Sequence, residues 1–282
     1  MKGRTVLITG GNTGIGRETA VALARAGAQV VFTSRDAEKG QAALAEIRAR
    51  SGSDAVEVME LDLARLGSVR DLASRVGDRF DRLDVLVNNA GLMLGSRRET
   101  ADGYEMTFQV NHLGPFLLTT LLGDRLAAGD RARVVNVASA AHKSARHGLN
   151  FDDLQSTHGY RSFSVYAKSK LANILFTREL ARRWDDHGIA VNAVHPGFVA
   201  SDFGRDGDMS RLAGLAYPLI RVFALTPEQG ARTQVHVASA PEVEGVTGGY
   251  WAKSAPATPS AAAQDDTAAA RLWAVSEQLV AG

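Results

Sequence analysis

The 282-residue sequence contains no cysteine, which excludes disulfide bonds, thiolate metal ligands and a cysteine nucleophile. It also lacks any apolar stretch of the roughly 18 residues that a membrane span needs. Residues 1–4 run directly into the apolar segment 6–8, without the features of a signal peptide. We therefore expect a cytoplasmic protein without a membrane anchor.

An excess of charge of either sign is also missing. The chain has 32 basic and 31 acidic residues, interspersed, for a net charge of +1. Without a basic stripe, nucleic acid is not an expected partner. The remaining composition, 45% hydrophobic and 22% charged, is typical of a soluble globular protein.

Short β-branched runs alternate with segments of helical apolar spacing. We expect strands at residues 5–9, 29–33, 55–60, 84–88, 133–138, 189–195 and 249–252. We expect helices at residues 15–26, 37–50, 65–80, 101–128, 162–184 and 227–238. Such alternation indicates parallel βαβ units with right-handed crossovers. The predicted fold is α/β: a Rossmann-type, doubly wound, mainly parallel seven-stranded sheet flanked by helices, in a single domain over residues 1–282.

A C-terminal extension, residues 253–282, departs from this alternation. Residues 254–264 are rich in Ala, Pro and Ser and are expected to be irregular. Thr267 could cap a last helix in which Leu272, Val275 and Leu279 share a face. We expect this helix to pack on the body or on a second subunit.

A glycine-rich segment follows the first strand and opens the first helix. Its candidate cofactor-binding residues are Gly10, Asn12, Thr13, Gly14, Ile15 and Gly16. The glycines allow a sharp turn, close approach to a pyrophosphate and close helix–strand packing, and the helix N-terminus offers free N–H groups to phosphates. The alternative, a glycine-rich turn that binds nothing, is weakened by its place directly after the first strand.

Five motifs, in order and at the usual intervals, resemble those of the short-chain dehydrogenase/reductase family. They are residues 9–16, residues 88–91 (Asn-Asn-Ala-Gly), Ser139, Tyr166 with Lys170, and residues 195–197 (His-Pro-Gly). The resemblance covers roughly residues 4–252, and residues 110–114, 167–173 and 271–273 look more narrowly like its retinol dehydrogenase-like branch. It implies an oxidoreductase that moves a hydride between a nicotinamide and a carbonyl or alcohol carbon.

Tyr166 and Lys170 are four residues apart in a helical segment and so share one face. An ammonium near the phenol, together with an oxidised nicotinamide, would favour the phenolate, which a free tyrosine with a pKa of about 10 does not form at neutral pH. A solvent-facing Tyr and Lys is the alternative for the bare pattern. The resemblance implies that Ser139 holds the substrate oxygen and that Asn111 supports a water-linked proton path through Lys170.

The end of the second predicted strand bears on the choice of nicotinamide. Ser34 stands where NAD-preferring relatives carry a carboxylate, and Arg35 can pair with a 2′-phosphate. Asp36 follows one position too late and could cap the next helix. We therefore predict NADP(H) as the cofactor. Arg17 is either a second phosphate contact or a solvated helix residue.

The resemblance adds further cofactor candidates along the strand ends. Asp62 either hydrogen-bonds the adenine amino group or caps a helix starting at Ala64. Asn88 is expected near the cofactor, whereas Asn89 is undecided. The other candidates are Leu63, Ala90 and Gly91, with Pro196, Gly197 and Val199 expected beside the nicotinamide carboxamide.

The substrate side is expected to include a mobile lid over about residues 200–225. Its apolar residues, with Leu92, Met93 and Leu94, suggest a hydrophobic or aromatic carbonyl substrate, although they could equally pack the lid or contact a subunit. A homodimer or homotetramer is one possible assembly. His142, His147 and His158 are interpreted as loop histidines near the substrate mouth, and no metal site is predicted.

The alternative to an enzyme is a non-catalytic NADP(H)-binding sensor. Such proteins commonly lose the tyrosine or the lysine, and both are present here.

Overall fold

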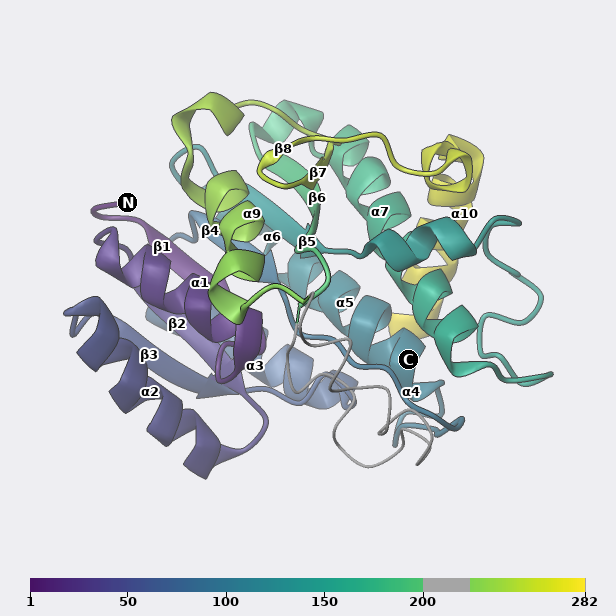
Figure 1. Ribbon diagram of the computed structural model, residues 1–282, viewed down its shortest axis with the longest axis horizontal. Helices are drawn as coiled ribbons and strands as arrows, with labels where there is room; N and C mark the ends of the chain where they lie inside the picture. The colour runs from purple at the N-terminus through teal and green to yellow at the C-terminus, as the bar shows by residue number, and fades with distance from the viewer. Residues whose placement is uncertain (200–223, 282) are drawn as a thin grey trace.

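A computed structural model of the protein describes residues 1–199 and 224–281 (Figure 1). Its centre is one sheet with the strand order β3-β2-β1-β4-β5-β6-β7-β8. The strands are β1 (Thr5–Ile8), β2 (Gln29–Ser34), β3 (Val56–Glu60), β4 (Val85–Asn88), β5 (Arg133–Val137), β6 (Ala190–His195), β7 (Tyr250–Ala252) and β8 (Ala255–Pro256). Because β1 to β7 pair in parallel, the predicted doubly wound sheet is confirmed.

The prediction of seven strands was wrong by one. The eighth strand, β8, pairs antiparallel with β7. Between them Lys253 and Ser254 both adopt positive φ angles, 53° and 57°, which is the geometry of a tight two-residue hairpin turn. This turn was not predicted, because two-residue hairpin turns usually contain Gly or Asn, and Lys253 and Ser254 are neither. Residues 254–264 are therefore only partly irregular, and they also include a short 3-10 helix, η5 (Ala261–Gln264).

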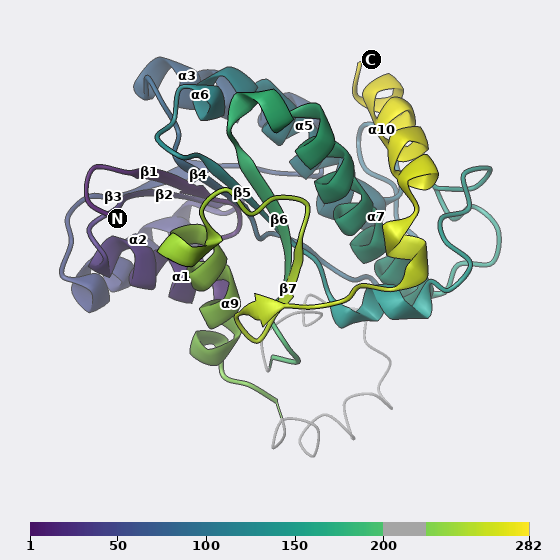
Figure 2. The same ribbon diagram turned by 90° about the horizontal axis from the view of Figure 1, so that it is seen from above.

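Helices cover both faces of the sheet, as Figure 2 shows. The helices on one face are α1 (Gly14–Arg25), α2 (Ala37–Ser51) and α9 (Pro227–Ser239). Those on the other are α3 (Leu66–Arg79), α5 (Gly114–Leu121), α6 (Gly123–Ala127) and α7 (Ser162–Arg183), with α10 (Asp266–Val280) packed outside α7. Strands β1 and β4 are buried along their whole length, as their continuous apolar runs require.

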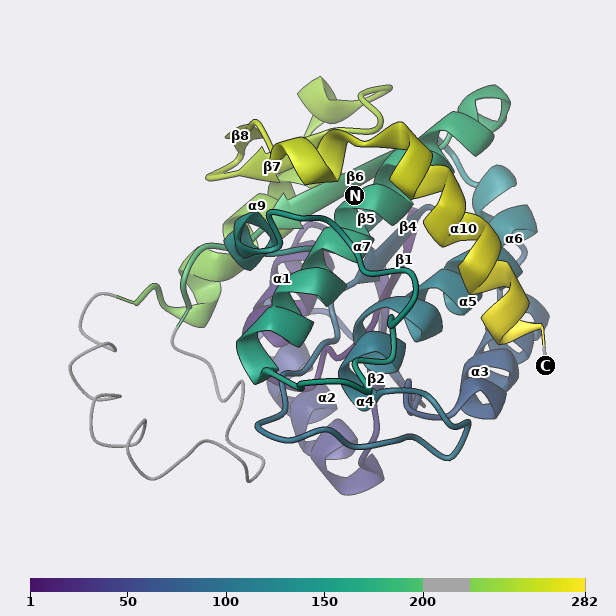
Figure 3. The ribbon, with the colours of Figure 1, turned by 90° about the vertical axis from the view of Figure 1, so that its right-hand side faces the viewer.

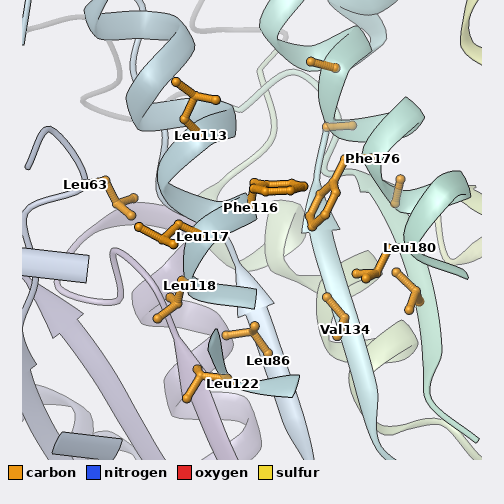
Figure 4. Close-up of a cluster of buried hydrophobic side chains, with 14 of the residues drawn as sticks. Leu63, Leu86, Leu113, Phe116, Leu117, Leu118, Leu122, Val134, Phe176 and Leu180 are labelled. Atoms are coloured by element: carbon orange, nitrogen blue, oxygen red, sulfur yellow. The ribbon is translucent and has the colours of Figure 1, made fainter. Parts of the chain in front are cut away.

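The larger hydrophobic core lies between the sheet and the layer of α3, α5 and α7. In Figure 4, Leu86 of the sheet faces Leu118 of α5 and Val134 lies toward Leu180 of α7. Phe116 and Phe176 meet with ring centroids 5.4 Å apart. Trp273 of α10 adds an edge-to-face contact to Phe116 at 4.9 Å. This packing fixes α5 and α7, which flank the candidate site.

The predicted helix over residues 101–128 is broken into several pieces, which corrects that prediction. Helix α4 (Met106–Phe108) continues into a π-helical turn, η1 (Gln109–Leu113), before α5 begins at Gly114. Pro115 cannot donate a backbone hydrogen bond, and the wider turn lets Gly114 N–H bond to Gln109 O instead. Asn111 lies inside this π turn.

The last helix forms as expected but begins differently. Asp265, rather than Thr267, caps α10, because its side chain accepts from Ala268 N at 2.9 Å. Leu272 is buried with Trp273, Ser276 and Val280, while Val275 and Leu279 are only half-buried. The helix packs on the body, against α7 (Figure 3). Across residues 1–199 and 224–281, none of the helices combines the length and apolarity needed to cross a bilayer.

Candidate active site

The sequence-predicted site residues gather at the carboxyl edge of the parallel strands. The glycine loop follows β1, residues 88–91 end β4, Ser139 follows β5, and residues 196–199 follow β6. Strand order reverses between β1 and β4, and ligands of open α/β sheets bind at such a switch point. This edge is therefore the candidate active site.

The glycine loop has a shape that side chains would destroy. Gly10 and Gly14 have φ angles of +66° and +53°, a region that L side chains rarely adopt. A Cβ atom added at Gly16 would collide with Gly10 O and with the amide nitrogen of Asn89. Thr33 supports the loop from β2, since its hydroxyl accepts from Gly10 N at 3.1 Å.

The first turn of α1 offers unused backbone donors. Thr13 is its N-cap, but no side chain caps the helix, and no acidic residue lies in the first turn. Asn12, Gly14 and Ile15 are half-buried around this helix end, with Thr13 exposed. Because free N–H groups and the helix dipole both favour an anion, the loop fits the pyrophosphate of a dinucleotide.

Arg17 takes part in ion pairs between α1 and α2. Its Nη1 donates to Glu46 of α2 at 2.6 Å. Glu46 and Glu18 also pair with Arg50, at 3.1 and 2.5 Å. Arg17 is thus part of an ion-pair network between α1 and α2.

The end of β2 presents no carboxylate at the position of Ser34. The Ser34 hydroxyl is buried and donates to Asp36 O at 2.7 Å, which closes the turn. Asp36 caps α2 by accepting from Lys39 N at 3.0 Å, so its expected capping role is confirmed. Arg35 is exposed between these two residues.

Asp62 closes the turn that precedes α3. Its carboxylate accepts from Ala64 N at 3.0 Å, and its own N–H donates to Ser68 Oγ at 3.0 Å. The helix itself starts at Leu66 with Arg65 as N-cap, so a helix beginning at Ala64 was wrong. Leu63 is buried beside it.

The two asparagines after β4 divide their contacts between the sheet and the loop. Asn88 donates to Thr119 Oγ1 at 2.9 Å and to Asn136 Oδ1 at 2.8 Å, so its side chain braces the sheet interior. The undecided residue, Asn89, is the one whose side chain reaches the glycine loop, with Thr9 O at 2.9 Å and Gly10 O at 3.2 Å. At the end of β4, Asn88 therefore offers its backbone, and not its side chain, to the site.

Tyr166 and Lys170 share one face of α7, and the solvent-facing alternative was wrong. Lys170 is 3% exposed, and its ammonium lies 5.7 Å from the Tyr166 ring centroid. The Tyr166 phenol is hydrogen-bonded with the Ser139 side chain. The structure therefore brings Ser139, which follows β5, together with Tyr166 and Lys170 of α7.

Burial moves the titration of both side chains away from their ordinary values. It raises the pKa of Tyr166 to about 12, against the opposing effect of the Ser139 hydrogen bond, and lowers the pKa of Lys170 to about 8. The surrounding residues alone therefore keep the Tyr166 phenol neutral at pH 7. The expectation of a lowered pKa applied to the site that also holds an oxidised nicotinamide.

Asn111 is fully buried and all of its amide atoms are used. Its Oδ1 accepts from Leu92 N at 2.7 Å, while its Nδ2 donates to Leu92 O and to Ser169 Oγ, each at 2.9 Å. A Cβ added at Gly91 would lie 3.1 Å from Asn111 Oδ1 and 3.2 Å from Lys170 Nζ. Asn111 and Lys170 therefore both face the Gly91 backbone.

Sequence reasoning missed Asn173 and the role of His142. Asn173 and Lys170 both donate to Val137 O, at 3.1 and 3.0 Å, and their i,i+3 spacing was a usable signal. His142 is fully buried, which corrects its interpretation as a loop histidine at the substrate mouth. His147 and His158 are exposed.

The segment after β6 turns beside the site. Gly197 has a φ of +92°, and its N–H lies 3.3 Å from His195 Nδ1. Pro196 and Val199 are half-buried, and Val199 forms an isolated bridge with Leu225. The expected lid lies almost entirely outside the described residues, since residues 200–223 are not among them.

Comparison with known proteins agrees with this architecture. The family model for short chain dehydrogenases matches residues 4–208. Human retinol dehydrogenase 13 is 41% identical over 282 residues, covering 99% of this chain and 85% of the relative. Mouse retinol dehydrogenase 12 is 44% identical over 278 residues, covering 99% and 86%.

Solved structures share the fold over most of the chain. An uncharacterized protein from Mycobacterium paratuberculosis is 37% identical with a TM-score of 0.79, covering 99% of this chain and 94% of that one. A short chain dehydrogenase from Burkholderia cenocepacia in complex with NADP is 29% identical with a TM-score of 0.70, covering 89% and 96%. The chain therefore belongs to the short-chain dehydrogenase/reductase family of oxidoreductases, in its retinol dehydrogenase-like branch.

Proposed function

We propose that this protein is an NADP(H)-dependent oxidoreductase that reduces an apolar or aromatic ketone or aldehyde to the alcohol. The observation that carries the proposal is the group of Ser139, Tyr166, Lys170 and Asn111, in which half-buried Ser139 and Tyr166 lie above the buried Lys170 and Asn111. All four residues lie at the switch-point edge of the sheet, where a bound dinucleotide and a small substrate can meet.

Each side chain has a role that its surroundings support. When bound, the reduced nicotinamide supplies the hydride. Tyr166 donates its phenolic proton to the substrate oxygen, and the Ser139 hydroxyl holds that oxygen. Lys170, buried beneath the tyrosine ring, stabilises the phenolate left behind. Asn111 fixes the Leu92 backbone through two hydrogen bonds and donates a third to Ser169 Oγ.

The protonation state of the isolated site favours reduction. Burial holds the pKa of Tyr166 at about 12, so the phenol carries its proton at neutral pH and can act as a general acid. Oxidation of an alcohol requires the phenolate instead. We therefore expect the alcohol-oxidising direction to need higher pH than the reducing direction.

The NADP(H) preference rests on the end of β2. Ser34 uses its hydroxyl within the turn and brings no carboxylate to repel a 2′-phosphate, while the exposed Arg35 provides a guanidinium. Two of the structural relatives, from Pseudomonas aeruginosa and Burkholderia cenocepacia, are NADP complexes at 29% identity.

Replacing Arg35 tests this preference directly. Arg35→Ala should lower kcat/KM for NADPH by about 10- to 100-fold and leave the value for NADH within about twofold, because only NADPH carries the 2′-phosphate. Arg131→Ala is the matched control, since Arg131 is exposed and precedes β5, at the opposite edge of the sheet. Equal losses with both cofactors would contradict the assigned phosphate contact.

The substrate class is inferred from apolar side chains beside the site. Leu92, Met93 and Leu94 are half-buried after β4, and Phe163 and Phe198 are 55% and 61% exposed near Tyr166 and Gly197 in sequence. A site that binds by burying apolar area suits a hydrophobic substrate. The relatives named retinol dehydrogenases agree, because retinol is an apolar alcohol.

The first experiment is NADPH oxidation in the presence of a panel of aromatic and aliphatic ketones and aldehydes. Tyr166→Phe should lower kcat by about 100-fold or more while changing the Kd for NADPH little, since it removes only the proton donor. Tyr104→Phe is the matched control, because that hydroxyl donates to Leu279 O on α10 instead. NADPH binding without turnover of any carbonyl would favour the sensor alternative.

A further inference from the structure

His142 lies at the centre of a contact between the candidate site and the C-terminal extension. It belongs to the short 3-10 helix η2 (Ala140–Ser144), whose N-cap is Ser139, and its side chain is fully buried. Its Nδ1 lies 2.6 Å from Ser139 O, and its Nε2 accepts from Ser260 N at 3.0 Å. One imidazole thus joins the residue after β5 to the segment before α10.

The two partners of the ring determine its tautomer. Ser260 N–H can only donate, so Nε2 must be the unprotonated nitrogen. Ser139 O can only accept, so Nδ1 must carry the proton. Burial also lowers the pKa of His142. The ring is therefore a neutral imidazole that donates toward the site and accepts from the extension.

On the site side, these hydrogen bonds fix the peptide group of Ser139. Ser139 O accepts from both the backbone N–H of His142, at 3.1 Å, and its Nδ1. The Ser139 hydroxyl accepts from Ala141 N at 3.2 Å and is hydrogen-bonded with Tyr166. With its carbonyl and its hydroxyl both held, Ser139 has little freedom to turn its hydroxyl away from the tyrosine.

On the other side, β7 and the extension together hold the ring in place. Tyr250 of β7 packs edge-on against His142, with the ring centroids 5.2 Å apart. Ala257 N donates to Tyr250 O at 2.8 Å, and Ser260 is the N-cap of η5. The chain then continues into α10 (Figure 3). Trp273 of this helix packs on Phe116 and Phe176. The ring's position therefore depends on residues far beyond the β5 loop.

We infer that His142 is a positioning residue, which holds the Ser139 carbonyl through its Nδ1–H, in the tautomer that Ser260 fixes, and so aims the Ser139 hydroxyl at the substrate oxygen and Tyr166. The inference rests on the proposed function, since it assigns a role in the same reaction. The contact with Ser260 lies outside residues 4–208, which the family model covers.

Two amide variants separate the two hydrogen bonds of the ring. In His142→Asn the amide nitrogen can take the place of Nδ1 and still donate to Ser139 O, but nothing reaches Ser260. In His142→Gln the amide oxygen can take the place of Nε2 and accept from Ser260 N, but the donor to Ser139 is lost. Both variants lose one hydrogen bond, so their Tm values should fall by similar small amounts.

The kinetic effects of the two variants should differ. His142→Gln should lower kcat by about 10- to 100-fold with KM for the carbonyl within about twofold, because the hydroxyl is misplaced in the transition state. His142→Asn should keep kcat within about threefold of the wild type. His147→Gln, on the exposed loop nearby, is the control and should match the wild type in kcat and Tm.

The opposite ranking, with His142→Asn the slower variant, would overturn the inference and leave the ring as an anchor for the extension. Equal kcat values in both variants would overturn it as well.

Failure of the proposed function is recognised separately, because wild-type protein would then turn over no carbonyl. In that case ¹⁵N spectra of the histidine side chains, assigned with His142→Asn, decide: an Nδ1–H signal from His142 supports the held Ser139 carbonyl, and an Nε2–H tautomer rejects it.

Discussion

At the residue scale, Lys170 is a buried ammonium, which destabilises the fold, and it lies beside the proposed proton donor Tyr166. Its side chain is 3% exposed, and its ammonium donates to the Val137 carbonyl at 3.0 Å. Burial disfavours the charged form and lowers the pKa to about 8, whereas an exposed lysine would titrate near 10.5. A group tuned in this way is typical of sites where function, rather than stability, fixes the residue.

The stability of a Lys170→Met variant tests this interpretation. Lys170 loses its proton above about pH 8 in the folded protein but only above about pH 10.5 in the unfolded chain. At pH 7 the buried side chain is therefore charged, and the cost of this burial lowers the free energy of unfolding. Removing the ammonium should raise the free energy of unfolding at pH 7 by about 1–2 kcal/mol and abolish activity. Asn173 still donates to Val137 O in the variant.

The pH dependence gives the sign of the effect. As pH rises from about 8 toward 10.5, the folded wild type sheds the proton and its penalty disappears, so the gain of Lys170→Met should shrink. Urea unfolding at pH 7 and at pH 9.5 measures the difference. A variant that is less stable than the wild type at pH 7 would contradict the predicted cost of the buried ammonium.

At the element scale, the turn between β1 and α1 shows why its glycines are required. The Gly16 position is filled on two sides, by Gly10 O and by the Asn89 side chain, which itself donates to Thr9 O and Gly10 O. The sequence indicated the close packing at Gly16, but not that Asn89 provides part of the wall. Asn89 lies 73 positions after Gly16, so no local sequence pattern could indicate this contact.

A methyl group at this position should therefore weaken cofactor binding. Gly16→Ala should raise the Kd for NADPH by about tenfold or more, because the loop must shift away from the shape that holds a pyrophosphate. Fluorescence titration with NADPH measures the change. Gly67→Ala in α3, where an added Cβ meets nothing within 4 Å, should leave the Kd unchanged. An unaltered Kd in Gly16→Ala would show that the loop is not the phosphate site.

The broken helix around Asn111 illustrates a second limit of local patterns. Apolar periodicity over residues 101–128 predicted one continuous helix, and most of the segment is helical. The π turn at Gln109–Leu113 leaves no periodic signature, because it changes only which carbonyl each N–H reaches. Its consequence is the placement of Asn111 against Leu92 and Ser169.

At the scale of the whole molecule, α10 ties the end of the chain to the helices that carry the site. Trp273 packs on Phe116 of α5 and Phe176 of α7, with centroid distances of 4.9 and 6.0 Å, and Arg183 lies 4.4 Å over its ring. His112, next to Asn111, also bonds to Ser276 of α10 at 2.8 Å. The last helix thus contributes to the core that supports both α5 and α7.

Truncating this tryptophan should destabilise the whole fold. Trp273→Ala should lower the free energy of unfolding by about 3–5 kcal/mol, as for large-to-small changes in a core. Trp273→Phe should cost less than about 1.5 kcal/mol, since the ring Nε1 has no hydrogen-bond partner within the described residues. Thermal unfolding of both variants provides the test, and similar losses in the two would argue against aromatic packing as the anchor.

The sequence by itself determined the parallel α/β sheet, since apolar runs covered on both faces and a glycine turn after the first strand are local patterns with few other solutions. It also determined the pairing of Tyr166 with Lys170, because four residues span one helical turn. Only the tertiary structure decided that Asn89 braces the glycine loop, that Asn88 faces the sheet interior, and that His142 joins Ser139 to Ser260. These contacts link residues from separate strands and helices, and their partners are fixed by packing rather than by spacing along the chain.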